Sequence, residues 1–449
     1  MHSIIENAIK EFKLLDNKPI YLVSHLDCDG ITAASIMIKV LKRENKKFIL
    51  NIVKQLNENT IKEISLENYK VIIFADLGSG YIKLINKYLK DKKVFIFDHH
   101  LPEDFNNYKN IVHVNPHLLQ DKYYNSISGS GITYLFAKTL NHENIDLAHL
   151  AVIGIIGDLQ NFDNINKEIL EDAINQEKIL VKYGLKMFGS QTKPLNKILQ
   201  YSTDLYIPGV SGNEEGVFLF LSELGINYFE NGRIKRIIDL NEDELKKLTT
   251  GIILKRLGSE KNPEDVFGNI YLLKDELDDN LKDAREFSTL LNCCGRLNKP
   301  SIGIGVCLDN FSFKEKANEL LKQYKLELIN GLNWFYNNKD KFVKGENFVV
   351  INSENNIRET LIGTIVSMIS RSNIYKDRTI LIGMAYTLDN NIKISVRQCN
   401  SDYNLVEIME NIIRDYGTSG GHKQACGALI SMERELEFIN KSKEVLSKI

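Results

Sequence analysis

The stretch Ile20-Tyr21-Leu22-Val23-Ser24 runs directly into His25-Leu26-Asp27-Cys28-Asp29-Gly30 near the start of the chain. Its short apolar run predicts a buried strand over 20–24, and the acidic residues would then follow the carboxyl end of that strand. Helical periodicity fills residues 31–43, so the stretch opens a β–α unit. In an open sheet of such units, ligands bind at the edge formed by the carboxyl ends of the strands.

The first 160 residues repeat this alternation of short β-branched runs with helical patterns, which predicts a mostly parallel sheet. The second helix of its last pair is apolar nearly all round and is therefore expected to be buried, although its final turn carries Asp158. Further strands are expected over 48–53, 71–75, 94–97 and 111–114, and helices over 81–89, 130–140 and 147–159.

The pattern changes in the middle of the chain. A helix is expected over 167–183, and Ser211 and Glu214 have capping-box spacing for a later one. Residues 200–290 are expected to be mainly helical and to close with a helix over 284–294, followed by a buried strand over 301–308 and a long helix over 313–337. The last 110 residues return to α/β alternation, with strands over 348–351, 379–385, 392–396 and 425–430 and helices over 357–370 and 405–416.

Composition sets the broad class of protein. With 449 residues the chain is long enough for two or three domains, and 43% hydrophobic residues with only 7 prolines exclude a disordered or collagen-like chain. The predicted fold class is α/β, with a parallel-sheet N-terminal domain, a mainly helical middle region and a smaller α/β C-terminal domain. The expected boundaries of these three parts are 1–200, 201–340 and 341–449.

Charge and cysteine content narrow the choice of partners. The 57 basic residues against 59 acidic ones give a formal net charge of −2, so a nucleic acid would have to be held by a local patch or by metal ions. The six cysteines contain no C-x-x-C pair, and the longest apolar stretch is far shorter than a membrane span. We therefore expect a cytoplasmic protein without a membrane partner.

Three of the expected N-terminal strands are followed by acid. The first is followed by Asp27 and Asp29, the third by Asp76, and the fourth by Asp98. Each acid alone is better explained as a helix cap or a turn residue. Together around one crevice, however, they would repel one another strongly unless cations neutralised them, and Asp158 would add to that repulsion. Carboxylates with imidazole and no thiolate favour Mn²⁺ or Mg²⁺, and two such ions suit in-line displacement at phosphorus.

At these residues the sequence resembles the DHH phosphoesterase superfamily, which is named for the triplet Asp98-His99-His100. The four motifs occur in the family's order: His25-x-Asp27-x-Asp29-Gly30, Asp76, the triplet, and Asp158 in Gly157-Asp158-Leu159. The turn Ser128-Gly129-Ser130-Gly131 resembles the family's Gly-rich turn, and the stretch from Glu286 to Arg296 resembles its archaeal RecJ-like, or GINS-associated, branch.

The resemblance implies a role for each motif residue. It implies that His100 meets the scissile phosphate or the leaving oxygen and that Asp98 orients a histidine, while His25 is either an additional ligand or lies just outside the metal shell. It implies two Mn²⁺ ions, with Mg²⁺ as the alternative, and these ligands, of which Asp76 would bridge the ions: Asp27, Asp29, Asp76, His99 and Asp158.

The segment Gly420-Gly421-His422 near the C-terminus resembles the signature of the DHH-associated C-terminal domain. Its glycines are expected in a turn whose backbone N–H groups bind phosphate, with His422 and Arg397 as side-chain donors. Without the resemblance, a plain connecting turn and a solvated arginine would be the better interpretations.

Three functions remain open from the sequence. The leading one is a metal-dependent exonuclease in DNA replication or repair that releases mononucleotides from single-stranded DNA in the 5′ to 3′ direction. The second is a 3′ to 5′ exoribonuclease or a phosphodiesterase for short oligonucleotides. The third is a non-catalytic replication scaffold that binds the GINS complex.

Overall fold

The computed structural model describes residues 1–104, 106–119, 121–124, 126–190, 192–202, 207–257, 263–372, 374–414 and 417–449. The described chain forms two compact units. The first holds Met1–Ser202 and Ile207–Leu321, and the second holds Lys322–Ile449. Among the described helices, none is long and apolar enough to cross a membrane.

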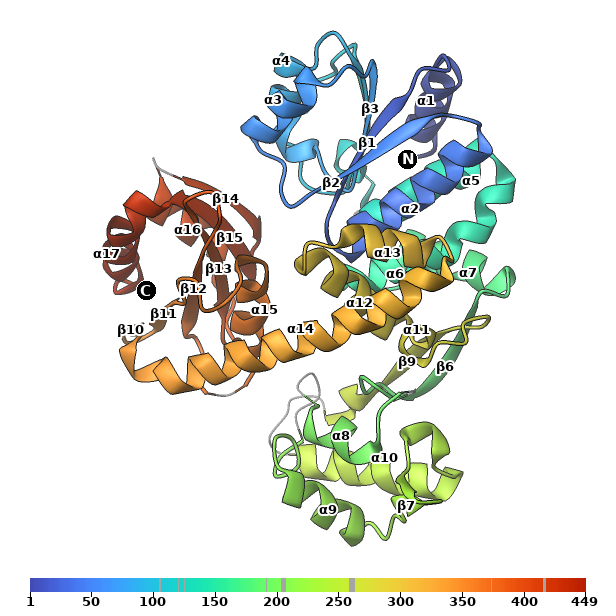
Figure 1. The fold of residues 1–449 in the computed structure, drawn as a ribbon. Helices are drawn as coiled ribbons and strands as arrows, with labels where there is room; N and C mark the ends of the chain where they lie inside the picture. Colours follow the sequence, from blue (N-terminus) through green and yellow to red (C-terminus); the bar gives the residue numbers. More distant parts are fainter. Residues whose placement is uncertain are drawn as a thin grey trace. The chain divides into compact units, whose positions relative to one another are not determined.

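A parallel five-stranded sheet in the order β2-β1-β3-β4-β5 forms the centre of the first unit (Figure 1). The predicted strands are confirmed, and the central ones are buried on both faces, as parallel sheets require. Ala75 is in register with Ser24 on one side and Phe97 on the other, so the first, third and fourth strands end side by side. The strands are β1 (Ile20–His25), β2 (Phe48–Val53), β3 (Val71–Ala75), β4 (Lys93–Phe97) and β5 (Ile111–Val114).

Helices cover both faces of this sheet. Side chains that alternate along β3 and β4 divide between the faces: Phe74 and Ile96 pack towards α3 and α4, whereas Phe97 packs against Phe136 of α5 with the two rings tilted. Phe12 of α1 adds to the second cluster, and α6 packs against α2 and α5. The helices are α1 (His2–Lys13), α2 (Cys28–Arg43), α3 (Glu58–Leu66), α4 (Ile82–Tyr88), α5 (Gly129–Leu140) and α6 (Ala148–Gly157).

The chain then leaves the sheet and returns to it. An antiparallel pair, β6 (Ile179–Leu185) and β9 (Phe267–Leu273), encloses a helical insert between its two strands. After β9, three helices lead back to α2 and α6. In chain order the remaining elements are α7 (Asn164–Asn175), α8 (Leu195–Gln200), α9 (Glu214–Glu223), β7 (Phe229–Glu230), β8 (Arg233–Ile234), α10 (Glu242–Arg256), α11 (Asp279–Lys282), α12 (Ala284–Arg296) and α13 (Pro300–Cys307).

Three sequence expectations for the first unit are wrong. The strand expected over 301–308 is helix α13, because Pro300 supplies a favourable first helical residue and an apolar run without alternation fits a buried helix equally well. The helix expected over 167–183 ends at Asn175, where Glu177 takes a φ of 54° and β6 follows. Asn213, not Ser211, caps α9.

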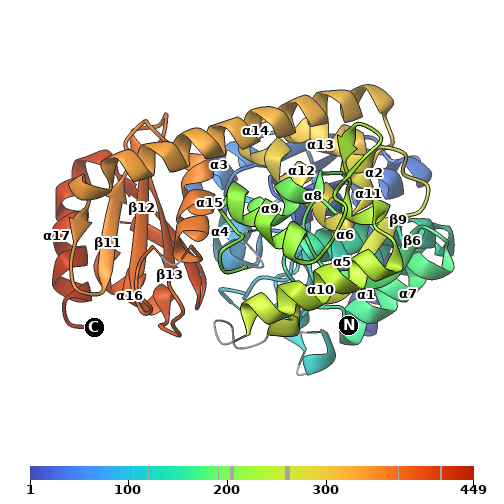
Figure 2. The ribbon, with the colours of Figure 1, turned by 90° about the horizontal axis from the view of Figure 1, so that it is seen from below.

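The second unit contains a six-stranded sheet in the order β10-β11-β12-β13-β15-β14. Helix α15 covers one face, and α16 and α17 pack on the other, as Figure 2 shows. The Gly-rich segment expected as a turn is edge strand β14. The elements are α14 (Phe311–Asn338, whose first residues belong to the first unit), β10 (Val343–Lys344), β11 (Phe348–Asn352), α15 (Glu359–Ser370), β12 (Ile380–Tyr386), β13 (Asn391–Gln398), α16 (Leu405–Ile413), β14 (Gly417–His422), β15 (Ala425–Ser431) and α17 (Glu435–Leu446).

A buried carboxyl group lies in the first turn of α12. Glu286 is 4% exposed, its Oε2 accepts a hydrogen bond from Thr192 Oγ1 at 2.9 Å, and its Oε1 has no hydrogen-bond partner among the described residues. Burial, followed by the charge of Asp283, raises the pKa of Glu286 to about 7. The folded state therefore resists ionisation of this group.

This pKa predicts how the stability depends on pH. The ordinary pKa of glutamate is 4.5, so the unfolded chain loses this proton first as the pH rises. Glu286 therefore stabilises the fold fully below pH 4.5, and that contribution is lost as the pH approaches 7. Glu286→Gln is expected to raise the free energy of unfolding at pH 8 by up to about 3 kcal/mol and to leave it unchanged at pH 4.

Urea unfolding of the full chain across this pH range measures the effect. Glu315→Gln, at an exposed position of α14, is the matched control and should run parallel to the wild type. A Glu286→Gln profile that also runs parallel to the wild type would contradict the prediction.

Candidate metal centre

The N-terminal residues predicted from the sequence all lie at one edge of the first sheet. Each belongs to the end of a strand or helix: His25 ends β1, Asp27 is the N-cap of α2 and Asp158 is the C-cap of α6. Asp29 lies in the first turn of α2, Asp76 follows β3, and Asp98, His99 and His100 follow β4.

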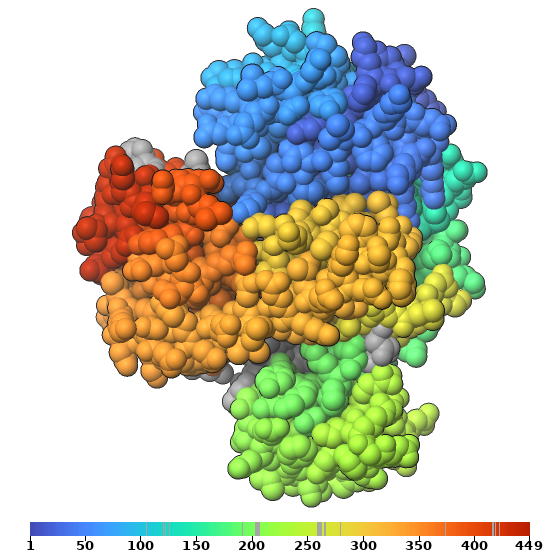
Figure 3. All heavy atoms as spheres, viewed as in Figure 1, coloured from blue at the N-terminus to red at the C-terminus, as the bar shows by residue number. Residues whose placement is uncertain are grey.

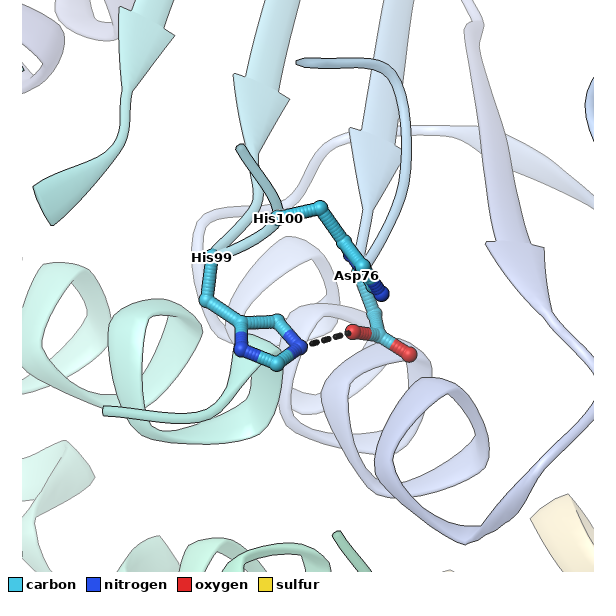
Figure 4. Close-up of side chains that lie close together, drawn as sticks. All are labelled: Asp76, His99 and His100. Atoms are coloured by element: carbon cyan, nitrogen blue, oxygen red, sulfur yellow. Dashed lines mark ion pairs between the residues drawn. The ribbon is translucent and has the colours of Figure 1, made fainter. Parts of the chain in front are cut away.

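His99 stands at the centre of one group of ligand atoms. Its Nε2 lies 3.5 Å from Asp76 Oδ1, 3.8 Å from Asp158 Oδ2 and 4.0 Å from Asp29 Oδ2. Figure 4 shows its ring pointing at the Asp76 carboxylate. Burial, with the charge of His100, lowers the pKa of His99 to about 4. The neutral ring that results is the form that binds a metal ion.

A second group of ligand atoms lies on the other side of Asp76. His25 Nδ1 is 2.9 Å from Asp27 Oδ2 and 3.9 Å from Asp76 Oδ2. Asp76 thus presents one oxygen to His99 and the other to His25. Three sets of side chains have ligand atoms within 4.8 Å of one another: Asp29 with His99 and Asp158, His25 with Asp27 and Asp76, and Asp76 with His99 and His100.

Asp76 carries the highest electrostatic cost at this edge. It is 2% exposed, and its Oδ1 has no hydrogen-bond partner in the described part of the chain. Burial, followed by the charges of Asp29 and Asp27, raises the pKa of Asp76 well above its usual range. The backbone at Asp76 has a φ of 63°, and a Cβ at Gly129 would lie 2.5 Å from its Oδ1. A carboxylate in such surroundings fits a divalent cation.

The other acids receive different support. Backbone N–H groups of Gly129 and Ser130, at the start of α5, donate to Asp29 at 2.7 and 3.0 Å. Asp158 accepts a hydrogen bond from Gln160 at 2.6 Å, yet burial and the charges of Asp29 and Asp27 raise its pKa to about 7. Burial alone would raise the pKa of Asp27, but the charge and hydrogen bond of His25 outweigh burial and hold it low.

Asp98 belongs to none of these three sets but holds His100, a member of one of them. Its Oδ1 is 2.7 Å from His100 Nδ1, and its Oδ2 accepts from the Ser79 backbone at 2.8 Å. Burial alone would lower the pKa of His100, but the charge of Asp98 outweighs burial and raises it to about 9. His100 therefore carries its proton at neutral pH and can donate from Nε2.

Two residues that sequence reasoning missed support this pair. Asn115 is fully buried, and its Nδ2 donates to Ser79 Oγ and to the His100 carbonyl, both at 2.8 Å. Ser79 Oγ also lies 2.9 Å from His113 Nε2. The sequence does contain a signal for Asn115, because this polar residue directly follows the predicted strand β5 and so lies at the same edge of the sheet.

The C-terminal candidates lie together in the second unit. Ala425 of β15 is in register with Arg397 of β13 on one side and His422 of β14 on the other, and Gly420 and Gly421 precede His422. Gly421 has a φ of 138°, and a Cβ there would lie 2.4 Å from the Ala425 carbonyl oxygen, so only glycine fits. The side chain of His422 lies outside the part of the chain that the structure describes.

Three protein-family models match this chain, one in its N-terminal part, one in its middle and one in its C-terminal part. Residues 19–155 match the DHH family, N-terminal domain, residues 187–266 match the DHH-CID domain, and residues 345–448 match the DHHA1 domain. An uncharacterized protein of Methanocaldococcus jannaschii is 30% identical over 460 residues, which cover 98% of this chain and 96% of that protein.

Solved structures of low sequence identity share the fold. RecJ from Thermus thermophilus in complex with Mn²⁺ is 14% identical to this chain, with a TM-score of 0.61. The match covers all of this chain (100%) but only about half (54%) of the RecJ chain. A second RecJ exonuclease, bound to manganese, has a TM-score of 0.59 and 14% identity; the match covers 100% of this chain and 93% of that one. Cdc45 from Entamoeba histolytica has a TM-score of 0.60 and 13% identity; the match covers 99% of this chain and 98% of that one. The chain therefore belongs to the DHH family, and it shares its fold with RecJ and Cdc45.

Proposed function

We propose that this chain is a metal-dependent exonuclease that hydrolyses single-stranded nucleic acid, most favourably DNA from its 5′ end, and releases mononucleotides. The observation that carries the proposal is the buried Oδ1 of Asp76, which has no hydrogen-bond partner among the described residues and lies between two groups of ligand atoms. Removing several acids from water is costly unless a cation compensates, and oxygen and imidazole donors suit Mn²⁺ or Mg²⁺.

The ligand residues that we propose are those of the two groups. Asp27, Asp29, Asp76, His99 and Asp158 would hold two ions, with Asp76 between them and His25 at their margin. Divalent ions bound there would supply Lewis-acid activation of the phosphate and of the attacking water.

Two further residues would act on the substrate side. His100, kept protonated by Asp98, would donate a hydrogen bond or a proton to the phosphate or the leaving oxygen. Because Asp98 also accepts from the Ser79 backbone, the imidazole has a fixed direction.

The second unit would hold a phosphate of the strand. Arg397 offers a guanidinium, which pairs well with phosphate, and the strand Gly420-Gly421-His422 offers backbone that a phosphate can approach closely. The end of the strand that this segment captures would set the polarity of digestion, so a 3′ to 5′ exoribonuclease or a phosphodiesterase for short oligonucleotides is the alternative.

A non-catalytic role is the second candidate, supported by the likeness to Cdc45. A scaffold that binds GINS would need the fold but not the buried acids. Retaining Asp76, Asp29 and Asp158 together costs folding free energy. That cost favours an enzyme.

The proposed metal site predicts that Asp76→Asn raises the stability of the metal-free protein but reduces its stabilisation by Mn²⁺. Asp76→Asn keeps the side-chain size and suits the left-handed backbone at this position. It removes a repelled, buried charge, so the melting temperature of the metal-free variant should exceed that of the wild type. Mn²⁺ at a hundredfold excess over its Kd should stabilise the wild type by about 3 kcal/mol and the variant by much less.

Thermal unfolding with EDTA and with Mn²⁺ measures both effects. Asp275→Asn is the matched control, because Asp275 is exposed and pairs with Lys178 away from the site. Equal stabilisation of the wild type and Asp76→Asn by Mn²⁺ would exclude the proposed bridging role.

The activity itself is tested on single-stranded DNA and RNA of one sequence, labelled at either end, with Mn²⁺. We expect mononucleotides from the 5′ end of DNA. Asp98→Ala and Asp158→Ala should each lower the rate by at least about 100-fold. They act differently, since only Asp158→Ala should also weaken Mn²⁺ binding.

The products distinguish the alternatives. Digestion of RNA from its 3′ end would support the exoribonuclease, and cleavage restricted to very short strands would support the oligonucleotide phosphodiesterase. A wild-type protein that binds Mn²⁺ and cleaves none of these substrates would favour the scaffold.

A further inference from the structure

Helix α12 lies against the loop that carries the first two acids of the metal centre. Figure 3 shows the yellow segment that contains α12 and α13 directly against the blue N-terminal part of the first unit. Asn292 Oδ1 accepts a hydrogen bond from the backbone N–H of Cys28 at 3.0 Å, although the two residues are 264 positions apart.

This hydrogen bond gives the backbone N–H of Cys28 an acceptor that its own loop does not provide. Cys28 is the first residue of α2, and the first N–H groups of a helix have no partner within the helix. Asp27 caps the helix but accepts from Gly30, not from Cys28. Because Cys28 is fully buried, its N–H depends on Asn292.

Gly295 makes the second contact, one helical turn further along α12. A Cβ at this position would lie 1.8 Å from the carbonyl oxygen of Leu26, so the helix backbone touches the loop backbone directly. Any side chain there would displace Leu26. Asn292 and Gly295 are three residues apart and therefore share one face of α12.

The two contacts enclose a single residue. The Leu26 carbonyl belongs to the peptide group before Asp27, and the Cys28 N–H belongs to the peptide group after it. The Asp27 side chain, which is 40% exposed, is held by His25 and by the N–H of Gly30, but neither contact holds the peptide groups on either side of it. Helix α12 thus holds both peptide groups around Asp27, and the same loop continues into Asp29.

We propose that Asn292 and Gly295 are positioning residues of the metal centre, which set the backbone of Asp27 and Asp29 for cation binding. The inference rests on the proposed metal site but not on the nucleic-acid substrate. It also gives a role to the segment from Glu286 to Arg296, which returns from the DHH-CID domain to complete the site.

Mn²⁺ binding to the full chain tests the proposal, with free Mn²⁺ followed by electron paramagnetic resonance. Loss of a residue that orients metal ligands typically weakens the metal by about 10- to 100-fold. We expect about 10-fold weaker binding for Asn292→Ala and a larger loss for Gly295→Ala. Asn292→Asp keeps an acceptor oxygen and should retain the affinity.

Two variants serve as matched controls. Thr289→Ala removes a hydroxyl that donates to the Arg285 carbonyl within the same helix, and Gly184→Ala adds a methyl group with ordinary contacts in β6. Both should bind Mn²⁺ as the wild type does. Thermal unfolding in EDTA is measured for every variant. Asn292→Ala leaves the buried Cys28 N–H without its acceptor, so it should melt below Thr289→Ala but remain folded at the temperature of the Mn²⁺ titration.

The outcomes separate this inference from the proposed function. Unchanged Mn²⁺ affinity in Asn292→Ala would overturn it, as would a loss of affinity that appears only at temperatures where the variant is partly unfolded in EDTA. If Gly295→Ala does not fold, the comparison of Asn292→Ala with Asn292→Asp decides. Weakened Mn²⁺ binding by Asn292→Ala would support the inference even if the wild type cleaved no nucleic acid, and a wild type without Mn²⁺ affinity would overturn both.

Discussion

Mutual repulsion among carboxylates buried at one sheet edge is the constraint on which the rest of this structure depends. Asp76 lies among Asp27, Asp29, Asp98 and Asp158 and is almost inaccessible to water. Burying such a group costs free energy that the fold alone does not return. The edge is therefore stable only with protons on some acids or cations among them, and an oxygen-rich site of this kind selects hard divalent ions.

The chain divides these acids into two classes by what it gives them. Asp98 receives a backbone N–H and a histidine, and Asp27 receives a histidine and the N–H of Gly30, so their pKa values stay low despite burial. Asp76 and Asp158 receive too few hydrogen bonds and positive charges to offset burial and repulsion, so their pKa values rise. The first class is already compensated by protein donors, whereas the second class lacks such donors and would gain most from a bound cation. The two roles thus follow from the distribution of donors.

The sequence predicts the first sheet well and the middle of the chain poorly, for one physical reason. Runs such as 71–75 are short, apolar and followed by a polar turn, so length and pattern both indicate strands. The run 301–308 has no alternation, and burial on all sides makes a helix and a strand look alike. The edge strand β14 is rich in glycine and carries no strand signal at all.

The same distinction applies to the metal centre. The places of the acids were predictable, because Asp27, Asp29, Asp76 and Asp98 directly follow strands and Asp158 ends an apolar helix, which is local information. The proposed roles of Asn292 and Gly295 were not, because they follow from contacts with Cys28 and Leu26, which lie far away in the sequence. A net charge of −2 on the chain would become about +2 with two divalent ions bound, so a polyanion would be attracted chiefly where those ions lie. The helix that fixes Asp27 would thereby also fix where this nearly neutral protein attracts its substrate.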